Sequence, residues 1–158
     1  SIDMIKDEIG IFTCWETIEH LHVEDMIRLF KKVHSKLSNG GYFCFSTPDY
    51  QNQICRLFDF GFAAPIQHLT ILSENWLDRF LNKFRFLTVK KFHGNMMLRN
   101  NSWSLYAEET SPTIEGKNIA NIFSKFLNKS ETRNRFLSLL YDCDLGSEII
   151  YILQKKDG

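Results

Sequence analysis

Two short apolar runs constrain the fold of this chain more than any other feature of its sequence. Residues 9–15 carry Thr13 as their one polar side chain, and residues 42–46 form a second, largely apolar run that soon reaches Pro48. Apolar runs of this length are typical of strands that are covered on both faces. Proline has no backbone N–H to donate to a neighbouring strand, so the second strand is predicted to stop there.

A helix is predicted between these two strands, beginning near Glu24. Its apolar residues recur at helical spacing, at Ile27, Phe30, Val33 and Leu37. The helix is predicted to end at Ser38-Asn39-Gly40-Gly41, because glycine readily adopts the left-handed conformation that stops a helix. A strand, a helix and a strand with short connections indicate a right-handed parallel crossover. The predicted fold class is therefore an open α/β sheet, with a ligand crevice at the carboxyl ends of its strands.

The rest of the chain continues the pattern of strands and helices. The irregular segment 49–71 is the longest candidate for an active-site loop or a short lid helix. Ser73 then caps a helix with the apolar positions Trp76, Leu77, Phe80, Leu81 and Phe84. Strands are predicted at 87–92 and 147–154, and the insertion between them combines a hairpin or irregular arm at 95–109 with amphipathic helices at 118–127 and 131–141.

The composition fits a single folded domain without a strong charge. Lys+Arg 19 and Asp+Glu 19 cancel, which gives no general attraction to nucleic acid or to anionic membranes. The four cysteines form no Cys-x-x-Cys pair, so a reduced, cytoplasmic location is expected. No run approaches the ~18 apolar residues that a membrane span needs. The sequence opens with Ser1 rather than Met, which leads us to expect further residues upstream.

Five motifs, taken in their order along the chain, resemble one known family. They are Glu16-x-x-Glu19-His20, Leu37-Ser38-Asn39-Gly40-Gly41, Ser46-Thr47-Pro48, His68-Leu69-x-x-x-Ser73 and the hydrophobic strand 148–153. Together they resemble the C-terminal portion of a class I S-adenosylmethionine-dependent methyltransferase, and in particular the ubiquinone-pathway O-methyltransferases. Two positions depart from the family pattern: Asp49 stands where many relatives have Asn, and Arg85-Phe86 stands where Gly-Phe is common.

The resemblance implies a partial Rossmann-like methyltransferase sheet, with residues 1–158 supplying the family's fourth to seventh strands. The last strand would be antiparallel and lie between the fifth and the sixth, and residues 95–146 would form an insertion that caps the acceptor site. No Gly-x-Gly-x-Gly cofactor loop occurs in the sequence, so we expect an N-terminal half of the same protein to supply it. The chain by itself is expected to be inactive.

A group of acids and histidines is the strongest candidate for a functional site. Glu16, Glu19 and His20 stand at i, i+3 and i+4, so they would share one face of a helix. The resemblance implies that His68 joins them, and similar sets bind a divalent ion in small-RNA 2′-O-methyltransferases and in ubiquinone-pathway enzymes. Two carboxylates and two imidazoles suit Mg²⁺, Mn²⁺, Fe²⁺ or Zn²⁺. The alternatives are acids that stabilise the start of a helix without metal, and a histidine that acts as a general base by itself.

Residues next to this group are candidates for contacts with the cofactor and the acceptor. The resemblance implies that Trp15, together with Glu16, borders S-adenosylmethionine, and core packing is the alternative interpretation of Trp15. Thr47, Pro48 and Asp49 would line the acceptor side of the crevice. Asp49 is a candidate base, with turn formation as the alternative interpretation. Glu19, His20 and Asp49 are therefore the candidate catalytic residues.

Three further residues lie in or next to the predicted loops. His68 and Trp103 are candidate acceptor-binding residues, since an indole can stack on a flat acceptor, although core or lid packing also explains Trp103. His93 is expected at a surface position.

The function implied by the resemblance is transfer of a methyl group from S-adenosylmethionine to a small molecule, favouring an oxygen acceptor over carbon or nitrogen. One alternative is a non-catalytic binding or scaffolding domain that kept the fold. The other is a metal-dependent RNA 2′-O-methyltransferase, which would bind RNA in a salt-sensitive manner.

Overall fold

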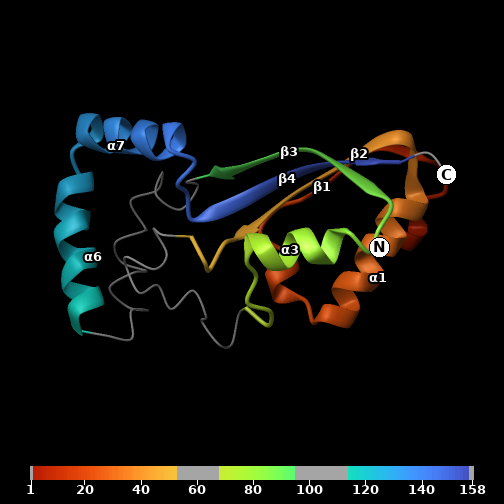
Figure 1. Cartoon of the computed structure of the whole chain (residues 1–158), viewed down its shortest axis with the longest axis horizontal. Helices are drawn as coiled ribbons and strands as arrows, with labels where there is room; N and C mark the ends of the chain where they lie inside the picture. The colour runs from red at the N-terminus through yellow and green to blue at the C-terminus, as the bar shows by residue number, and fades with distance from the viewer. Residues whose placement is uncertain (1, 53–67, 95–113, 157–158) are drawn as a thin grey trace.

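The computed structural model describes residues 2–52, 68–94 and 114–156, which form a four-stranded sheet and its flanking helices (Figure 1). The strands are β1 (Ile9–Cys14), β2 (Leu37–Pro48), β3 (Phe86–Gly94) and β4 (Glu148–Lys155). The helices are α1 (Val23–Lys36), α3 (Glu74–Leu81), α6 (Ile114–Leu127) and α7 (Ser130–Asp142), with the 3-10 turns η1 (Ile2–Met4) and η2 (Ile18–His20). The predicted hairpin or arm at 95–109 and most of the predicted loop at 49–71 lie outside the described residues.

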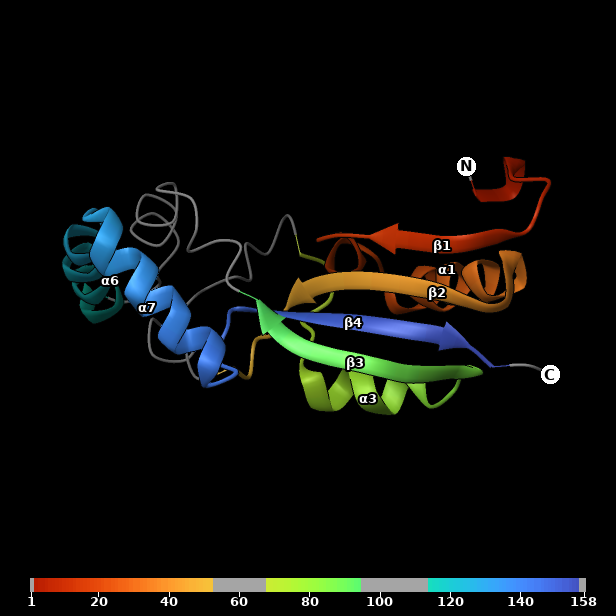
Figure 2. The ribbon, with the colours of Figure 1, turned by 90° about the horizontal axis from the view of Figure 1, so that it is seen from above.

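The sheet has the strand order β1-β2-β4-β3, with β1 parallel to β2. β4 runs antiparallel to both β2 and β3, and residues such as Phe43 pair with Leu153 across this junction. An antiparallel last strand between its two neighbours is the arrangement that the sequence analysis expected. β1, β2 and β3 therefore end at the same edge of the sheet, and the chain leaves α7 to enter β4 from that edge (Figure 2).

Helices α1 and α3 both lie on one face of the sheet and build the core there (Figure 2). The apolar side of α1 delivers Phe30, whose ring lies 5.0 Å from that of Phe43 and 5.1 Å from that of Phe80 of α3, measured between centroids. Edge-on aromatic pairs at this separation are favourable beyond their buried area. Ser73 caps α3 as predicted, because its hydroxyl accepts a hydrogen bond from the backbone N–H of Trp76 at 3.4 Å.

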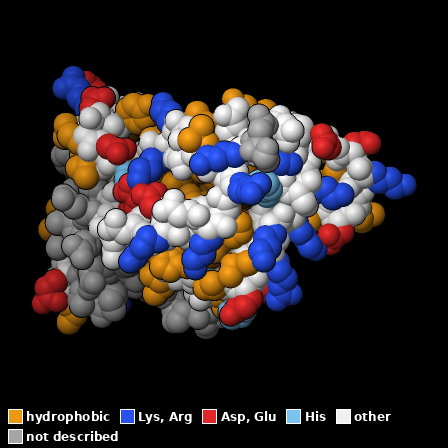
Figure 3. All heavy atoms as spheres, turned by 45° about the vertical axis from the view of Figure 1, so that its right-hand side comes forward, with side chains coloured by type: hydrophobic (Ala, Val, Ile, Leu, Met, Phe, Trp, Pro, Cys, Tyr) orange, Lys and Arg blue, Asp and Glu red, His pale blue; other side chains and the backbone are white. Residues whose placement is uncertain are grey.

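The opposite face of the sheet remains accessible, so the expectation that β1 is covered on both faces was wrong. Ile11 is 66% exposed, and Leu87 and Val89 of β3 are about half exposed. The reason is that α1 and α3 share the other face, and no helix among the described residues lies over the middle of this one. On the side of the molecule drawn in Figure 3, hydrophobic side chains also reach the surface between Lys and Arg side chains.

The glycine pair after α1 acts inside β2 and does not stop the helix, which corrects a second prediction. Helix α1 ends at Lys36 with an extended Leu37, and the left-handed residue is Gly40, at φ 72°. Gly41 is needed for a close approach, because a Cβ there would lie 2.9 Å from the carbonyl oxygen of Ser38. These glycines allow the irregular start of β2 to pass close to β1.

Helices α6 and α7 lie beyond the edge at which the parallel strands end (Figures 1 and 2). They begin and end close to the predicted bounds 118–127 and 131–141. The connection from α7 to β4 packs tightly, since a Cβ at Gly146 would collide with the backbone of Gly94 at the end of β3. None of the helices in the described ranges combines the length and apolar character needed to cross a membrane.

Candidate functional site

The chain turns sharply where it leaves β1, and this turn separates Glu16 from the other predicted ligands. Glu16 has a φ of 45°, and its backbone N–H donates to the carbonyl oxygen of Ser46 at 3.2 Å. Its carboxylate accepts a 2.6 Å hydrogen bond from the Ser46 hydroxyl. The helix that follows is the short turn Ile18–His20, so the three-residue helical face assumed from the i, i+3, i+4 spacing does not form. Glu16 instead belongs to the junction between β1 and β2.

Glu19 is buried at the centre of the site, with 1% of its surface exposed. Its Oε2 atom accepts a hydrogen bond from the Thr47 hydroxyl at 3.1 Å. Its backbone carbonyl accepts hydrogen bonds from the N–H groups of Leu69 at 2.8 Å and Thr70 at 3.0 Å. Glu19 thus holds the end of β2 on one side and the segment that carries His68 on the other.

His20 and His68 lie beside this carboxylate, so the structure brings together three of the four predicted metal ligands. One ligand atom each from Glu19, His20 and His68 lies within 4.8 Å of the others. The His20 Nε2 atom is 3.7 Å from Glu19 Oε1, and the two imidazole centroids are 4.8 Å apart. The hydroxyl of Tyr50 lies 2.7 Å from Nδ1 of His68, a hydrogen bond that fixes the orientation of this ring.

The donor set fits a divalent cation chemically. It offers one buried carboxylate and two imidazoles, which Mn²⁺, Fe²⁺ and Zn²⁺ all accept as ligands. The second oxygen of Glu19 is held by Thr47, and one nitrogen of His68 is held by Tyr50, as outer partners usually hold metal ligands. Glu16 is not among the residues that converge on this point.

The electrostatics of Glu16 set it apart from an ordinary surface acid. Burial raises its pKa to about 7, the hydrogen bond from Ser46 opposes this rise, and the nearby carboxylates of Glu148 and Glu19 add to it. The Glu16 carboxyl group therefore gains or loses its proton in the neutral pH range. A carboxyl group of this kind, at the end of a strand, is typical of functional sites.

A second cluster joins Asp49, Glu74 and His93 on the other side of the β2 terminus. Asp49 is 3% exposed, and its Oδ2 atom lies 3.2 Å from Nε2 of His93. Its Oδ1 atom accepts hydrogen bonds from the backbone N–H groups of Gln51 at 3.1 Å and Glu74 at 3.3 Å. Both oxygens of Asp49 are thus engaged by protein groups that join β2, α3 and β3.

The two partners of this cluster shift one another's pKa. Burial disfavours the Asp49 carboxylate, but its hydrogen bonds to His93 and to the backbone outweigh burial, so its pKa lies below the ordinary value. The hydrogen bond to Asp49 raises the pKa of His93, against burial, and the Asp144 carboxylate 3.3 Å from Nδ1 adds to this. His93 is 8% exposed, so the expectation of a surface position was wrong.

No local signal in the sequence marks His93, because its partner Asp49 is 44 residues away. The two residues meet only once β4 separates β2 from β3 in the sheet.

A pocket of about 870 Å³ opens between α7 and the carboxyl ends of β1 to β3. Trp15 lines it and is 50% exposed, whereas Thr47 is fully buried with its hydroxyl turned to Glu19. Pro48 is also buried, and Trp103 lies outside the described residues. Among the described residues that were predicted to face the cofactor or the acceptor, Trp15 is the one that both lines this pocket and remains accessible.

Comparison with known proteins identifies the family. The family model described as "Methyltransferase domain" matches residues 6–126, which is more than half of the chain. This chain therefore belongs to the methyltransferase domain family. In a comparison with curated proteins, none matched the sequence.

Several solved structures share the fold of this chain. A SAM-dependent methyltransferase from Archaeoglobus fulgidus aligns with a TM-score of 0.56 and 16% identity over 98% of this chain and 63% of its own. The cyclopropane synthase MmaA2 from Mycobacterium tuberculosis gives 0.51 and 11% over 98% and 58%. A putative methyltransferase from Bacillus halodurans gives 0.54 and 12% over 99% and 70%. The chain thus spans less than two thirds of the length of the first two.

Proposed function

We propose that this chain forms the acceptor-binding part of a methyltransferase that uses S-adenosylmethionine to methylate an oxygen of a small molecule, as the ubiquinone-pathway O-methyltransferases do. The observation that supports this most is the convergence of Glu19, His20 and His68 at the carboxyl edge of the sheet. In open α/β sheets this edge is where ligands bind. Trp15 and Glu16 are proposed to border the cofactor, which supplies the methyl group.

We propose that Glu19, His20 and His68 hold a divalent cation, which when bound lowers the pKa of a hydroxyl group in its coordination sphere. The protein contributes positioning, because Thr47 and Tyr50 fix two of these ligands before any acceptor arrives. In the alternative without a metal, His20, whose side chain is 43% exposed, is the group that receives the acceptor proton.

In this proposal Asp49 does not act as a base, which a free carboxylate could do. Its two oxygens already accept hydrogen bonds from His93, Gln51 and Glu74. We therefore assign Asp49 to positioning, since it holds the end of β2 and the start of α3 at fixed places beside the pocket. Thr47 and Pro48 support the same strand end from within the core.

The metal proposal is tested by titrating Mn²⁺ into the full-length protein and into Glu19→Ala and His68→Ala variants by calorimetry. Loss of an outer-shell partner typically weakens metal binding by about 10–100-fold, so loss of a ligand should weaken it by about 100-fold or more. His22→Ala is the matched control, because His22 is an exposed histidine at the start of α1 that is not part of the cluster. Equal Mn²⁺ affinity in all four proteins would refute the metal site.

Methyl transfer is measured separately, with labelled S-adenosylmethionine and a panel of phenols and aliphatic alcohols. We expect turnover that a chelator abolishes and Mn²⁺ restores. Turnover that is indifferent to chelator would remove the metal from the proposal and leave the methyltransferase. Metal binding without transfer to any hydroxyl compound would refute the proposed reaction.

A further inference from the structure

A second group of side chains suited to metal binding lies where β2, α3 and β3 meet. One ligand atom each from Asp49, Glu74 and His93 lies within 4.8 Å of the others. Asp49 and His93 are at least nine-tenths buried, and the Glu74 side chain is 34% exposed. This cluster shares no residue with the site of the proposed function, so it is considered separately from that function.

The distances within the cluster suit a cation that contacts all three side chains. Nε2 of His93 lies 3.2 Å from Oδ2 of Asp49 and 3.9 Å from Oε2 of Glu74. Two ligand atoms that each lie ~2.0–2.2 Å from a tetrahedral Zn²⁺ are ~3.3–3.6 Å apart. A single N–H group on Nε2 reaches only one of the two carboxylates, because 3.9 Å is too long for a hydrogen bond.

The other nitrogen of His93 gives a second observation. Although the residue is only 8% exposed, its Nδ1 atom has no hydrogen-bond partner among the described residues. This atom lies 3.3 Å from Oδ1 of Asp144, so without a proton on Nδ1 a lone pair faces a carboxylate. A cation on Nε2 requires the ring proton to be on Nδ1. A histidine that ligates a metal usually directs this N–H group to a carboxylate, as Asp144 would allow here.

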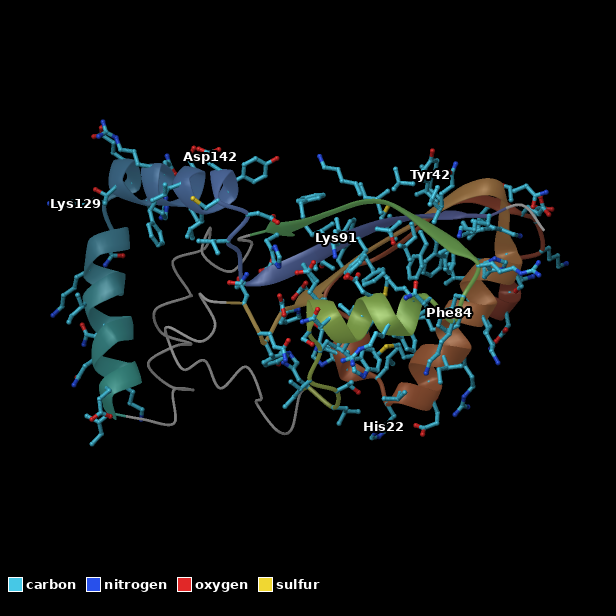
Figure 4. All side chains as sticks on the ribbon, viewed as in Figure 1. His22, Tyr42, Phe84, Lys91, Lys129 and Asp142 are labelled. Carbon is cyan, nitrogen blue, oxygen red and sulfur yellow. The ribbon has the colours of Figure 1, made fainter. Side chains whose placement is uncertain are left out.

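The charges around the cluster favour a divalent cation over a second ring proton. Four carboxylates surround it, those of Asp49, Glu74, Asp78 and Asp144. Lys91 of β3, labelled in Figure 4, pairs with the two carboxylates of α3. Even with His93 doubly protonated, two negative charges are left without compensation, and Arg133 and Glu148 in the larger pocket beside His93 cancel one another. A divalent cation removes this excess of negative charge.

A pocket of about 320 Å³ opens at the cluster and gives a cation access from solvent. Besides the three candidate ligands, its lining includes the side chains of Gln51 and Asn75. Three protein ligands leave one position of a tetrahedral ion for water, which this polar pocket can hold. The second oxygen of Asp49 is already fixed by backbone N–H groups, as the outer partners of metal ligands usually do.

We infer that Asp49, Glu74 and His93 bind a Zn²⁺ ion, with Asp144 as the outer partner of His93. Zn²⁺ accepts imidazole and carboxylate ligands together, whereas Mg²⁺ and Ca²⁺ prefer oxygen ligands alone. The three ligands come from separate elements, so the bound ion holds the end of β2, the start of α3 and the end of β3 together. Without the ion, Asp49 and His93 form the ion pair described above.

Calorimetry with Zn²⁺ tests this inference on the full-length protein with His20→Ala, which removes an accessible ligand of the first candidate metal site. We expect this protein to bind Zn²⁺ at the second cluster. Adding Glu74→Gln should weaken that binding by about 100-fold or more, since loss of an outer partner already weakens metal binding by about 10–100-fold. Thermal unfolding should show that Zn²⁺ stabilises the His20→Ala protein and has lost this effect after Glu74→Gln.

Asp78→Asn in the same background is the matched control. Asp78 lies one turn after Glu74 in α3 and also pairs with Lys91, but it is not a member of the cluster. The two substitutions remove the same charge, so their difference reports coordination. Asp78→Asn should weaken Zn²⁺ binding by no more than about fivefold, the effect of one exposed charge. Equal weakening by both substitutions, or no Zn²⁺ binding in the His20→Ala protein, would overturn the inference.

X-ray absorption at the zinc edge identifies the ligands in the His20→Ala protein. We expect one imidazole together with oxygen ligands at ~2.0–2.2 Å. Two imidazoles, or a sulfur ligand at ~2.3 Å from one of the cysteines, would place the ion elsewhere and contradict the inference. A failed zinc experiment leaves the Mn²⁺ titration of the first site and the methyl-transfer assay unaffected, because the two clusters have no residue in common.

Discussion

At the scale of single residues, Glu16 shows how a strand end can make an ordinary acid titrate near neutral pH. Its left-handed backbone turns the carboxyl group back onto Ser46, where the carboxylates of Glu19 and Glu148 also act on its pKa. Burial then favours the protonated form, which the hydrogen bond from Ser46 only partly offsets. The same residue type at an exposed position would remain charged through the neutral range.

Glu16→Gln should therefore make stability less dependent on pH. The folded state holds the Glu16 proton up to a pKa of about 7, above the ordinary value of 4.5, so stability falls as the pH rises between these values and is then constant. Removing the carboxyl group should abolish this fall and stabilise the protein at pH 8 by roughly 1–2 kcal/mol after allowance for partial solvent exposure. Urea unfolding from pH 4 to 8 measures it. Glu8→Gln, at an exposed position, is the matched control.

At the scale of elements, the Asp49–His93 pair joins three pieces of structure. Asp49 directly follows β2, His93 lies near the end of β3, and Glu74 begins α3 with its N–H on the same carboxylate. The backbone N–H of His93 also donates to Asp144, in the connection between α7 and β4, at 2.9 Å. A complete buried ion pair of this kind changes the free energy of folding little. Removal of one partner leaves a buried charge without compensation, which destabilises the fold.

His93→Gln should destabilise the fold by about 3 kcal/mol near pH 6. The raised pKa of His93 gives stability that is complete below its ordinary value of 6.5 and is lost as the pH rises through the folded-state pKa. The lowered pKa of Asp49 gives stability that is complete above 3.8 and is lost as the pH falls through its folded-state pKa.

The effect of the variant should thus be greatest between those limits and smaller at pH 9, as measured by urea unfolding. His22→Gln serves as the control, since His22 is exposed and lies outside this cluster. An equal loss of stability at pH 6 and at pH 9 would mean that the ion pair is not its source.

At the scale of the whole molecule, a close packing of backbone holds helices α6 and α7 to the sheet. The connection from α7 enters β4 beside the end of β3, and Gly146 touches the backbone of Gly94 there. Because α7 forms one wall of the pocket, this contact also sets the width of the pocket. No side chain larger than hydrogen fits at Gly146 without moving one of the two segments.

Gly146→Ala should therefore destabilise the protein by about 2–3 kcal/mol, as overpacking of a fixed backbone does. Gly10→Ala is the matched control, since a Cβ at Gly10 meets nothing within 4 Å. That change should stay within about 0.5 kcal/mol of the unmodified protein. Thermal unfolding of both variants gives the comparison, and equal melting temperatures would contradict the packing described here.

Much of the architecture could be predicted from local patterns in the sequence. The apolar runs and helical spacings located β1, α1, α3, β3, α7 and β4 to within a few residues, and the motifs around Glu19 and His68 predicted that these two residues meet. Those features depend on short-range periodicity and on strand order. Each of these features can be predicted from the residues that form it, or from a family motif that contains those residues.

The remaining features depend on contacts that spacing does not reveal. Glu16 leaves the predicted ligand set because one residue adopts a positive φ, which glutamate rarely does and no pattern signals. His93 is buried because it contacts Asp49, which lies two strands away in the sheet. Ile11 is exposed because α1 and α3 both cover the other face of the sheet. Such outcomes are decided by tertiary structure.

The pairing of Gly94 with Glu148 determines how freely the segment between them can vary during evolution. The segment between them leaves and rejoins the sheet at directly opposed positions, only ~5 Å apart. Its length and content can change without disturbing strand register, as at the closed end of any hairpin. Relatives with different substrates can thus arise by replacement of the segment between these two residues, and the same replacement can be made in the laboratory.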